Sequence, residues 1–144
     1  MTVGSTTPVA EGLFSVEDGE PRLIGSQCAR CGVVSFPEQG SCPRCTSLEV
    51  RRRLLARRGT LWSWTIQCFA PKSPPYAVAD PDSFEPYGVG YVELPGEVRV
   101  EARLTVASPD LLRIGMPMEL VLVQAPGAAD DVVTYAFGPV EEAP

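Results

Sequence analysis

Two Cys-x-x-Cys pairs, separated by ten residues, constrain the fold of this chain more than any other feature of its sequence. Each pair can form a tight knuckle that aims both sulfurs at one point, and two knuckles complete the tetrahedral sulfur shell that suits Zn²⁺. Gly32 follows the first pair, where a left-handed residue helps backbone N–H groups reach the thiolates, whereas Thr46 stands at the equivalent place after the second pair. Residues 33–36 and a turn at 37–40 fit a hairpin between the pairs. The sequence therefore predicts a structural zinc site with the ligands Cys28, Cys31, Cys42 and Cys45.

Two other interpretations of the four cysteines stay open. An iron site of the rubredoxin type uses the same ligand geometry, so the spacing alone does not exclude it. The second is a pair of disulfides. Residues 1–10 lack the basic-then-apolar order of a secretion signal, so we expect a cytoplasmic location, where disulfides are rare. Four protein ligands leave no open position on the metal, so we expect zinc to fold the ribbon rather than to catalyse.

The chain contains no histidine, and Lys72 is its only lysine. A Ser-His-Asp triad, a Cys-His couple and a histidine metal ligand are therefore excluded, and an enzyme that acts alone is not expected. The fifth cysteine, Cys68, shares an alternating face with Trp62 and Trp64, and no histidine base is available to activate it. We expect a buried structural thiol and core tryptophans, with stacking of a tryptophan on a base or adenine ring as the alternative.

Charge is distributed unevenly along the chain. Residues 1–21 carry four acids and no base, residues 22–58 carry eight arginines and two acids, and residues 59–144 carry four bases and twelve acids, so their net charges are −4, +6 and −8. The basic part ends in a dense run that comprises Arg51, Arg52, Arg53, Arg57 and Arg58. These side chains fit a solvated strand, a contact with cofactor phosphates or an acidic partner, or a contact with nucleic acid. The acidic second half disfavours nucleic acid because it would repel a polyanion.

Short stretches of alternating polar and apolar residues fill the second half of the chain. They predict strands over 62–68, 88–94, 98–106, 118–123 and 133–137. Five such strands fit a small barrel such as an OB-fold. A single helical turn is expected at 108–112 with Ser108 as its cap, and residues 49–58 favour a strand that leads into the barrel. No apolar run is long enough to cross a membrane.

A proline-rich segment, residues 70–86, joins the first two of these strands. Loops this long are often functional, although a surface excursion without a role is the alternative. If the loop covers a ligand or a partner, the contacts would come from Lys72, Ser73, Tyr76, Phe84 and the adjacent Tyr87. Gly88 and Gly90, just beyond it, indicate a bend or a close approach of two backbones.

The chain resembles the family of zinc-ribbon-plus-OB-fold proteins associated with acyl-CoA metabolism. The resemblance covers residues 23–139 and rests on five motifs, which are Gln27-Cys-Ala-Arg-Cys-Gly32, Cys42-Pro-Arg-Cys45, Gly59-Thr-Leu-Trp-Ser-Trp-Thr65, Pro86-Tyr-Gly-Val-Gly-Tyr-Val-Glu-Leu94 and Ile114-Gly-Met-Pro-Met118. It implies a mainly β fold, with an N-terminal rubredoxin-like zinc ribbon followed by a five-stranded OB-fold barrel. The expected division is an acidic, flexible segment (1–21), the ribbon (22–49), an arginine-rich connector (50–58), the OB-fold (59–139) and a tail (140–144).

The resemblance also implies a function. Members of this family are non-catalytic subunits of thiolase-like enzymes, including acetyltransferases, lipid-transfer-type thiolases and the retro-aldolases of steroid side-chain breakdown, and some pair with hydratases. The partner supplies the catalytic residues, and the family member supports assembly and helps form the acyl-CoA entrance. Many members carry a helical pair before the ribbon, whereas residues 1–21 here show no helical pattern. A nucleic-acid-binding module is the alternative function, since zinc ribbons and OB-folds both occur in such proteins.

Overall fold

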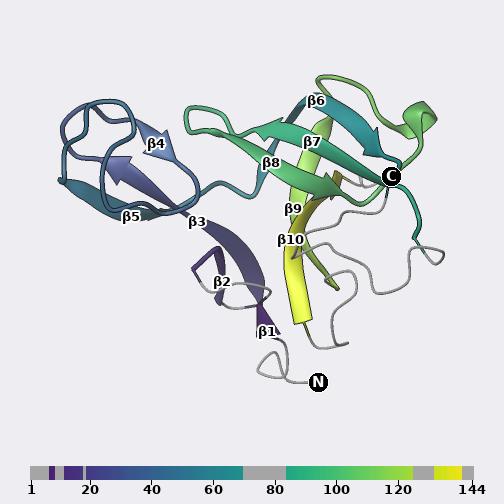
Figure 1. Cartoon of the computed structure of the whole chain (residues 1–144), viewed down its shortest axis with the longest axis horizontal. Coiled ribbons are helices and arrows are strands. Elements are labelled where there is room, and N and C mark those ends of the chain that lie inside the picture. Colours follow the sequence, from purple (N-terminus) through teal and green to yellow (C-terminus); the bar gives the residue numbers. More distant parts are fainter. Residues whose placement is uncertain (1–6, 9–11, 18, 70–83, 125–131, 141–144) are drawn as a thin grey trace.

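The computed structural model describes residues 7–8, 12–17, 19–69, 84–124 and 132–140. Within them nearly all of the regular secondary structure is β-strand, as the sequence predicts. The strands form two connected parts, a ribbon built from β2 to β5 and a barrel built from β6 to β10 (Figure 1). Lys72, Ser73 and Tyr76, which the sequence analysis places in the covering loop, lie outside the described residues.

The ribbon contains a long central strand that pairs with three shorter ones. This central strand is β3 (Glu20–Cys28), and its antiparallel neighbours are β2 (Phe14–Glu17), β4 (Val34–Ser35) and β5 (Val50–Leu54). β3 and β4 therefore form a hairpin whose turn is the first cysteine knuckle. The sequence analysis instead places the hairpin turn at residues 37–40.

Two expected segment boundaries differ from the strands of the ribbon. β3 begins at Glu20 and forms a hairpin with β2, in which Phe14 is buried, so strand structure extends into the segment expected to be flexible. β5 lies in the expected connector and completes the ribbon sheet. An extended strand over 50–54 agrees with the sequence, but its partner is β3 and not a barrel strand.

The barrel is a closed ring of five strands. In chain order these are β6 (Arg58–Gln67), β7 (Tyr87–Glu93), β8 (Arg99–Leu104), β9 (Pro117–Gln124) and β10 (Val132–Pro139). The hydrogen-bonded order around the ring is β6–β7–β8–β10–β9, and β9 returns to β6. Only β8 and β10 run parallel within the ring, which is the OB-fold arrangement. A two-residue strand, β1 (Thr7–Pro8), pairs with β10.

Several local predictions for the barrel are confirmed. Val100, Ala102 and Leu104 point into the core from alternate positions of β8. The turn between β8 and β9 is a short 3-10 helix, η3 (Pro109–Leu111), and the Ser108 side chain accepts a hydrogen bond from the backbone N–H of Asp110. Gly90 marks a close backbone approach, because a Cβ there would lie 2.6 Å from the carbonyl oxygen of Ser63.

The prediction that Trp62 and Cys68 are buried is wrong. β6 changes register against β7 between Leu61 and Ser63, which is a β-bulge. The bulge adds one residue to the alternation, so Trp62 turns outward and is 46% exposed. Trp64 falls back into the inward pattern and packs against the core. Cys68 is exposed because β6 ends at the preceding residue.

One hydrophobic core extends through the ribbon and the barrel. The buried cluster includes Leu23 and Leu55 from the ribbon side together with Leu61, Val92 and Phe137 from the barrel. Because these side chains pack in one cluster, the ribbon is held against the barrel. Within the described residues, no helix has the length and apolar character that a membrane crossing requires.

Candidate metal centre

The first cysteine knuckle turns the chain sharply at the end of β3. The backbone N–H groups of Arg30 and Cys31 both lie 3.4 Å from Sγ of Cys28 and donate to it. The N–H of Gly32 donates to the carbonyl of Cys28 at 3.0 Å, and the φ angle of Gly32 is +80°. The left-handed residue predicted after the first pair is confirmed.

The second knuckle repeats the same pattern with a different residue at its end. The N–H groups of Arg44 and Cys45 lie 3.4 Å from Sγ of Cys42, and the N–H of Thr46 donates to the carbonyl of Cys42 at 3.0 Å. Thr46 has a φ angle of +64° and is the single non-glycine residue with positive φ in the described part of the chain. A β-branched residue is unfavourable in this region, so the knuckle geometry is maintained against a local cost.

The two knuckles bring their four sulfurs together into one cluster. Cys28 and Cys45 are 3.6 Å apart at Sγ, Cys31 and Cys42 are 3.5 Å apart, and all four sulfurs lie within 4.8 Å of one another. Four sulfurs at a zinc–sulfur distance of about 2.3 Å in a tetrahedron are roughly 3.8 Å apart. The cluster therefore fits one tetrahedral metal ion, and no other group of three or more metal-ligating side chains occurs among the described residues.

The thiols differ in acidity because backbone donors are distributed unevenly among them. The N–H of Cys31 stabilises the Cys28 thiolate and lowers the pKa of Cys28 to about 6, although burial acts in the opposite direction. The pKa of Cys42 is lowered in the same way by the N–H of Cys45. The N–H of Ser47 acts to lower the pKa of Cys45, but burial and the neighbouring thiols together raise it to about 11. Backbone donors thus favour the thiolate form at Cys28 and Cys42, which is the form that metal ligation requires.

Most of the arginine run is neutralised within the chain. Four of its five members form ion pairs with acidic side chains, namely Arg52 with Glu38, Arg53 with Glu97, Arg57 with Glu20 and Arg58 with Glu119, at distances from 2.8 to 3.5 Å. Arg51 is exposed and forms no ion pair with a described residue. The run is therefore spread over several acidic partners and is not one basic patch.

The two described aromatic residues of the predicted covering loop lie together. Phe84 and Tyr87 pack edge to face with ring centroids 6.1 Å apart. Tyr87 is buried at the start of β7, and the guanidinium of Arg103 stacks on its ring at 4.1 Å. Arg103 was missed by the sequence analysis, since nothing in the alternation of β8 distinguishes it from other polar residues.

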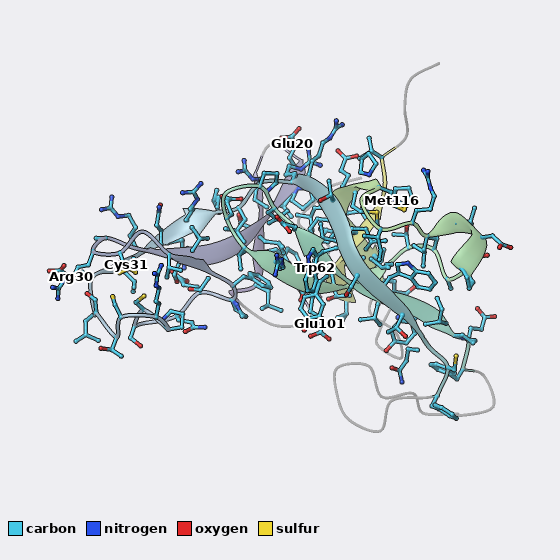
Figure 2. All side chains as sticks on the ribbon, turned by 90° about the horizontal axis from the view of Figure 1, so that it is seen from above. Glu20, Arg30, Cys31, Trp62, Glu101 and Met116 are labelled. Atoms are coloured by element: carbon cyan, nitrogen blue, oxygen red, sulfur yellow. The ribbon has the colours of Figure 1, made fainter. Side chains whose placement is uncertain are left out.

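The four-cysteine cluster lies apart from the barrel. Figure 2 shows Arg30 and Cys31 at the outer end of the ribbon, far from Trp62 and Glu101 on the barrel. None of the four cysteines lines the barrel pocket formed by described residues of β6, β7, β8 and β10.

Comparison with known proteins identifies this arrangement of a four-cysteine ribbon and an OB-fold. Residues 18–51 match the family model of the ChsH2 rubredoxin-like zinc ribbon domain, and residues 52–123 match that of the ChsH2 C-terminal OB-fold domain. The chain belongs to the ChsH2 family. The two models match this chain in the predicted order, so the predicted resemblance and fold class are confirmed.

Two curated proteins and one solved structure are similar to this chain over most of its length. A "DUF35 domain-containing scaffold protein" of Methanocaldococcus jannaschii is 31% identical over 83% of this chain and 82% of its own length. The "Benzoylsuccinyl-CoA thiolase subunit BbsA" of Thauera aromatica is 30% identical over 81% of this chain and 76% of its own length. A chain of the solved structure "Ltp2-ChsH2(DUF35) aldolase" is 29% identical, with a TM-score of 0.60, and the match covers 82% of this chain and 84% of that one.

Proposed function

We propose that this chain is a non-catalytic zinc-binding subunit that assembles with a thiolase-like acyl-CoA enzyme and helps to form or gate its acyl-CoA site. The observation that most supports this proposal is the structural match between this chain and a chain of the Ltp2-ChsH2 aldolase structure, which covers most of both chains. The similarity to a benzoylsuccinyl-CoA thiolase subunit supports the same class of partner.

The chemistry of the metal centre supports a structural role for zinc. Four thiolates would occupy all tetrahedral positions of the ion, so no position is left for a substrate or a water. Zinc would supply folding free energy to the ribbon. The chain has no histidine, so proton transfer in an acyl-CoA reaction would come from the partner.

The residues proposed for contact with acyl-CoA or with the partner differ in whether their charges are already matched within this chain. Arg51 is the strongest of the arginine run because its charge is not matched by an ion pair in the described part of the chain. Arg52, Arg53, Arg57 and Arg58 would have to exchange an internal carboxylate for a phosphate. Phe84 and Tyr87 offer an aromatic contact at the end of the covering loop, to which Lys72, Ser73 and Tyr76 also belong.

Co-expression tests this proposal directly. The tagged chain is produced with each thiolase-like, retro-aldolase and hydratase subunit of the source genome in turn, and complexes are sized by light scattering after gel filtration. We expect one thiolase-like subunit to form a stable hetero-oligomer whose acyl-CoA turnover falls at least about tenfold without this chain. A chain that stays uncomplexed with every subunit, or a partner equally active alone, contradicts the proposal.

A further inference from the structure

The barrel presents an outward face on three neighbouring strands, β6, β7 and β8. Tyr91 on β7 lies directly opposite Glu101 on β8, and Val89 lies opposite Arg103. These residues point away from the core, because Val100, Ala102 and Leu104 at the alternate positions of β8 point into it. The β-bulge adds Trp62 to this face from β6.

Trp62 is the centre of an ordered aromatic cluster on the face. The guanidinium of Arg99 stacks on the indole at 4.0 Å, and Glu93 pairs with Arg99 at 3.2 Å. Tyr91 meets Trp62 edge to face at 6.2 Å, and both rings are exposed, by 40% and 46%. Tryptophan, tyrosine and arginine are the residue types that are enriched in protein-binding hot spots, and here all three lie in contact on an exposed surface.

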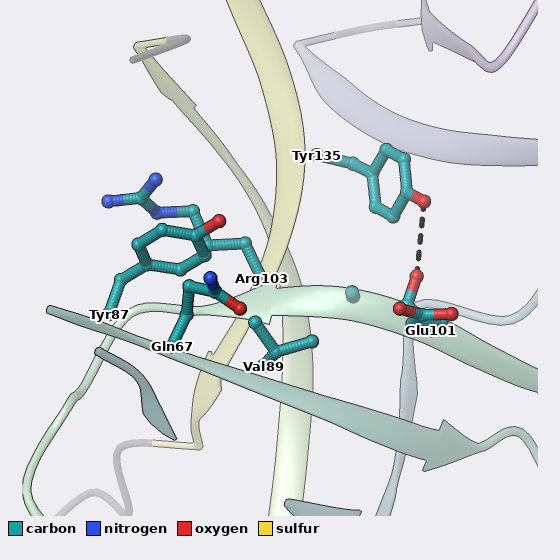
Figure 3. Close-up of a pocket in the computed structure, with 7 residues that line it drawn as sticks. Gln67, Tyr87, Val89, Glu101, Arg103 and Tyr135 are labelled. Atoms are coloured by element: carbon teal, nitrogen blue, oxygen red, sulfur yellow. Dashed lines mark hydrogen bonds between the residues drawn. The ribbon is translucent and has the colours of Figure 1, made fainter. Parts of the chain in front are cut away.

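A pocket of about 270 Å³ lies beside this cluster and is lined by residues of the same strands and by Tyr135 of β10. Its lining includes Gln67, Tyr87, Val89, Glu101, Arg103 and Tyr135. Figure 3 shows Arg103 stacked with Tyr87 at one end, and Glu101 with Tyr135 at the other, where the Tyr135 hydroxyl donates to the Glu101 backbone carbonyl at 3.1 Å.

Arg103 carries a positive charge that the pocket does not neutralise. None of the ion pairs among the described residues includes it, and its buried Nη1 has no hydrogen-bond partner. The Glu101 carboxylate accepts a hydrogen bond from the hydroxyl of Tyr91 instead. A guanidinium donor without an acceptor is unfavourable, and a carboxylate is the planar group that best complements it.

We propose that the outward face of β6, β7 and β8 is the docking surface for the partner enzyme, with Trp62 as its anchor and Arg103 as the receptor for a partner aspartate or glutamate. This assignment rests on the proposed function and adds the place and the chemistry of the contact. The partner segment is a protein surface that presents one carboxylate to the pocket and an apolar group to the Trp62 cluster. Nucleic acid fits this surface less well, because the Arg99 guanidinium already covers one face of the Trp62 indole and because Glu93 and Glu101 place two carboxylates beside the cluster.

The test compares variants in the complex formed by the wild-type chain with its thiolase-like subunit. We expect Trp62→Ala and Arg103→Glu each to weaken the complex by about 30-fold or more, as removal of a hot-spot residue does. Ile114→Ala and Arg113→Glu remove exposed side chains outside the face and are expected to leave the affinity within about twofold. Full metal content and an unchanged unfolding midpoint identify variants that fold.

Two further measurements keep the assignment testable if Arg103→Glu does not fold. Hydrogen–deuterium exchange of the wild-type complex is expected to show protection of 87–93 and 99–104, and an aspartate- or glutamate-to-arginine change on the partner is expected to restore binding to Arg103→Glu where that variant folds.

Undiminished binding by Trp62→Ala, or protection confined to other strands, overturns the docking surface while the proposed function stands. A wild-type chain that binds no such subunit refutes both proposals. Saturable binding of a single-stranded oligonucleotide that is lost in Trp62→Ala also overturns the assignment.

Discussion

The Nε atom of Arg53 lies 2.8 Å from Oε2 of Glu97, and this ion pair joins the ribbon sheet to the turn between β7 and β8. The other oxygen of Glu97 accepts a hydrogen bond from the backbone N–H of Ala56 at 2.8 Å, and Arg53 also donates to the side-chain oxygen of Gln27 at 2.8 Å. The Glu97 side chain is only 6% exposed. An arginine that the sequence offers as a ligand contact is thus part of the connection between the two domains.

Loss of the Glu97 carboxylate is expected to destabilise the chain. Glu97→Ala leaves the Nε of Arg53 and the N–H of Ala56 without the acceptor that the buried Glu97 side chain supplies, which costs about 1–3 kcal/mol of the free energy of unfolding. Urea unfolding followed by tryptophan fluorescence measures this loss. Glu38→Ala is the matched control, because the Arg52–Glu38 pair is exposed and should contribute less than about 1 kcal/mol. Equal losses in the two variants would show that Glu97 does not connect the domains.

Replacement of a metal-site cysteine is expected to abolish metal binding. Cys42→Ser removes one of four ligands from a buried position, so we expect the zinc content to fall from about one ion per chain to near zero and the ribbon to unfold. Metal analysis after gel filtration, together with amide exchange in residues 20–54, measures both effects. Cys68→Ser is the control, since Cys68 lies outside the cluster and is exposed. Iron in place of zinc in the purified wild-type protein would contradict the metal assignment.

Metal affinity is expected to rise with pH. The pKa of Cys45 is raised to about 11, so this thiol is protonated in the metal-free site at neutral pH and must release its proton to bind the metal. The pKa of Cys28 is lowered to about 6, so its proton is already lost above that pH and it adds to the pH dependence only below about 6. Chelator competition at pH 6.5, 7.5 and 8.5 measures the trend. An affinity that is constant or falls over this range would be inconsistent with protonated ligands.

Gly90 is expected to tolerate no side chain. A Cβ at this position would lie 2.6 Å from the Ser63 carbonyl oxygen and 3.0 Å from a Leu61 side-chain carbon, so Gly90→Ala forces β6 and β7 apart. Overpacking of this kind costs about 1–3 kcal/mol. Gly40→Ala is the control, because nothing lies within 4 Å of a Cβ there. Thermal unfolding midpoints compare the two variants, and an unchanged midpoint for Gly90→Ala would contradict the close approach.

Part of the site could be predicted because it depends on local spacing. A Cys-x-x-Cys pair determines its own knuckle, so the cluster of four cysteines and the left-handed Gly32 follow from the sequence. Arg103 could not be predicted as a pocket residue, because the pocket also needs Gln67 of β6 and Tyr135 of β10, which are distant from it in sequence. The ion pairs of the arginine run could not be predicted for the same reason, since the acidic side chains that neutralise it lie from 14 to 61 residues away along the chain.

The sequence by itself determined the cluster of four cysteines, the number of barrel strands and most of their inward residues, because each depends on a short-range period. Only the tertiary structure decided that Trp62 is exposed, that four of the five arginines are paired, and that Arg103 lacks a carboxylate partner among the described residues. A single bulge shifts the alternation of a strand, and an ion pair depends on which strands meet. Neither property is encoded in the spacing of neighbouring residues.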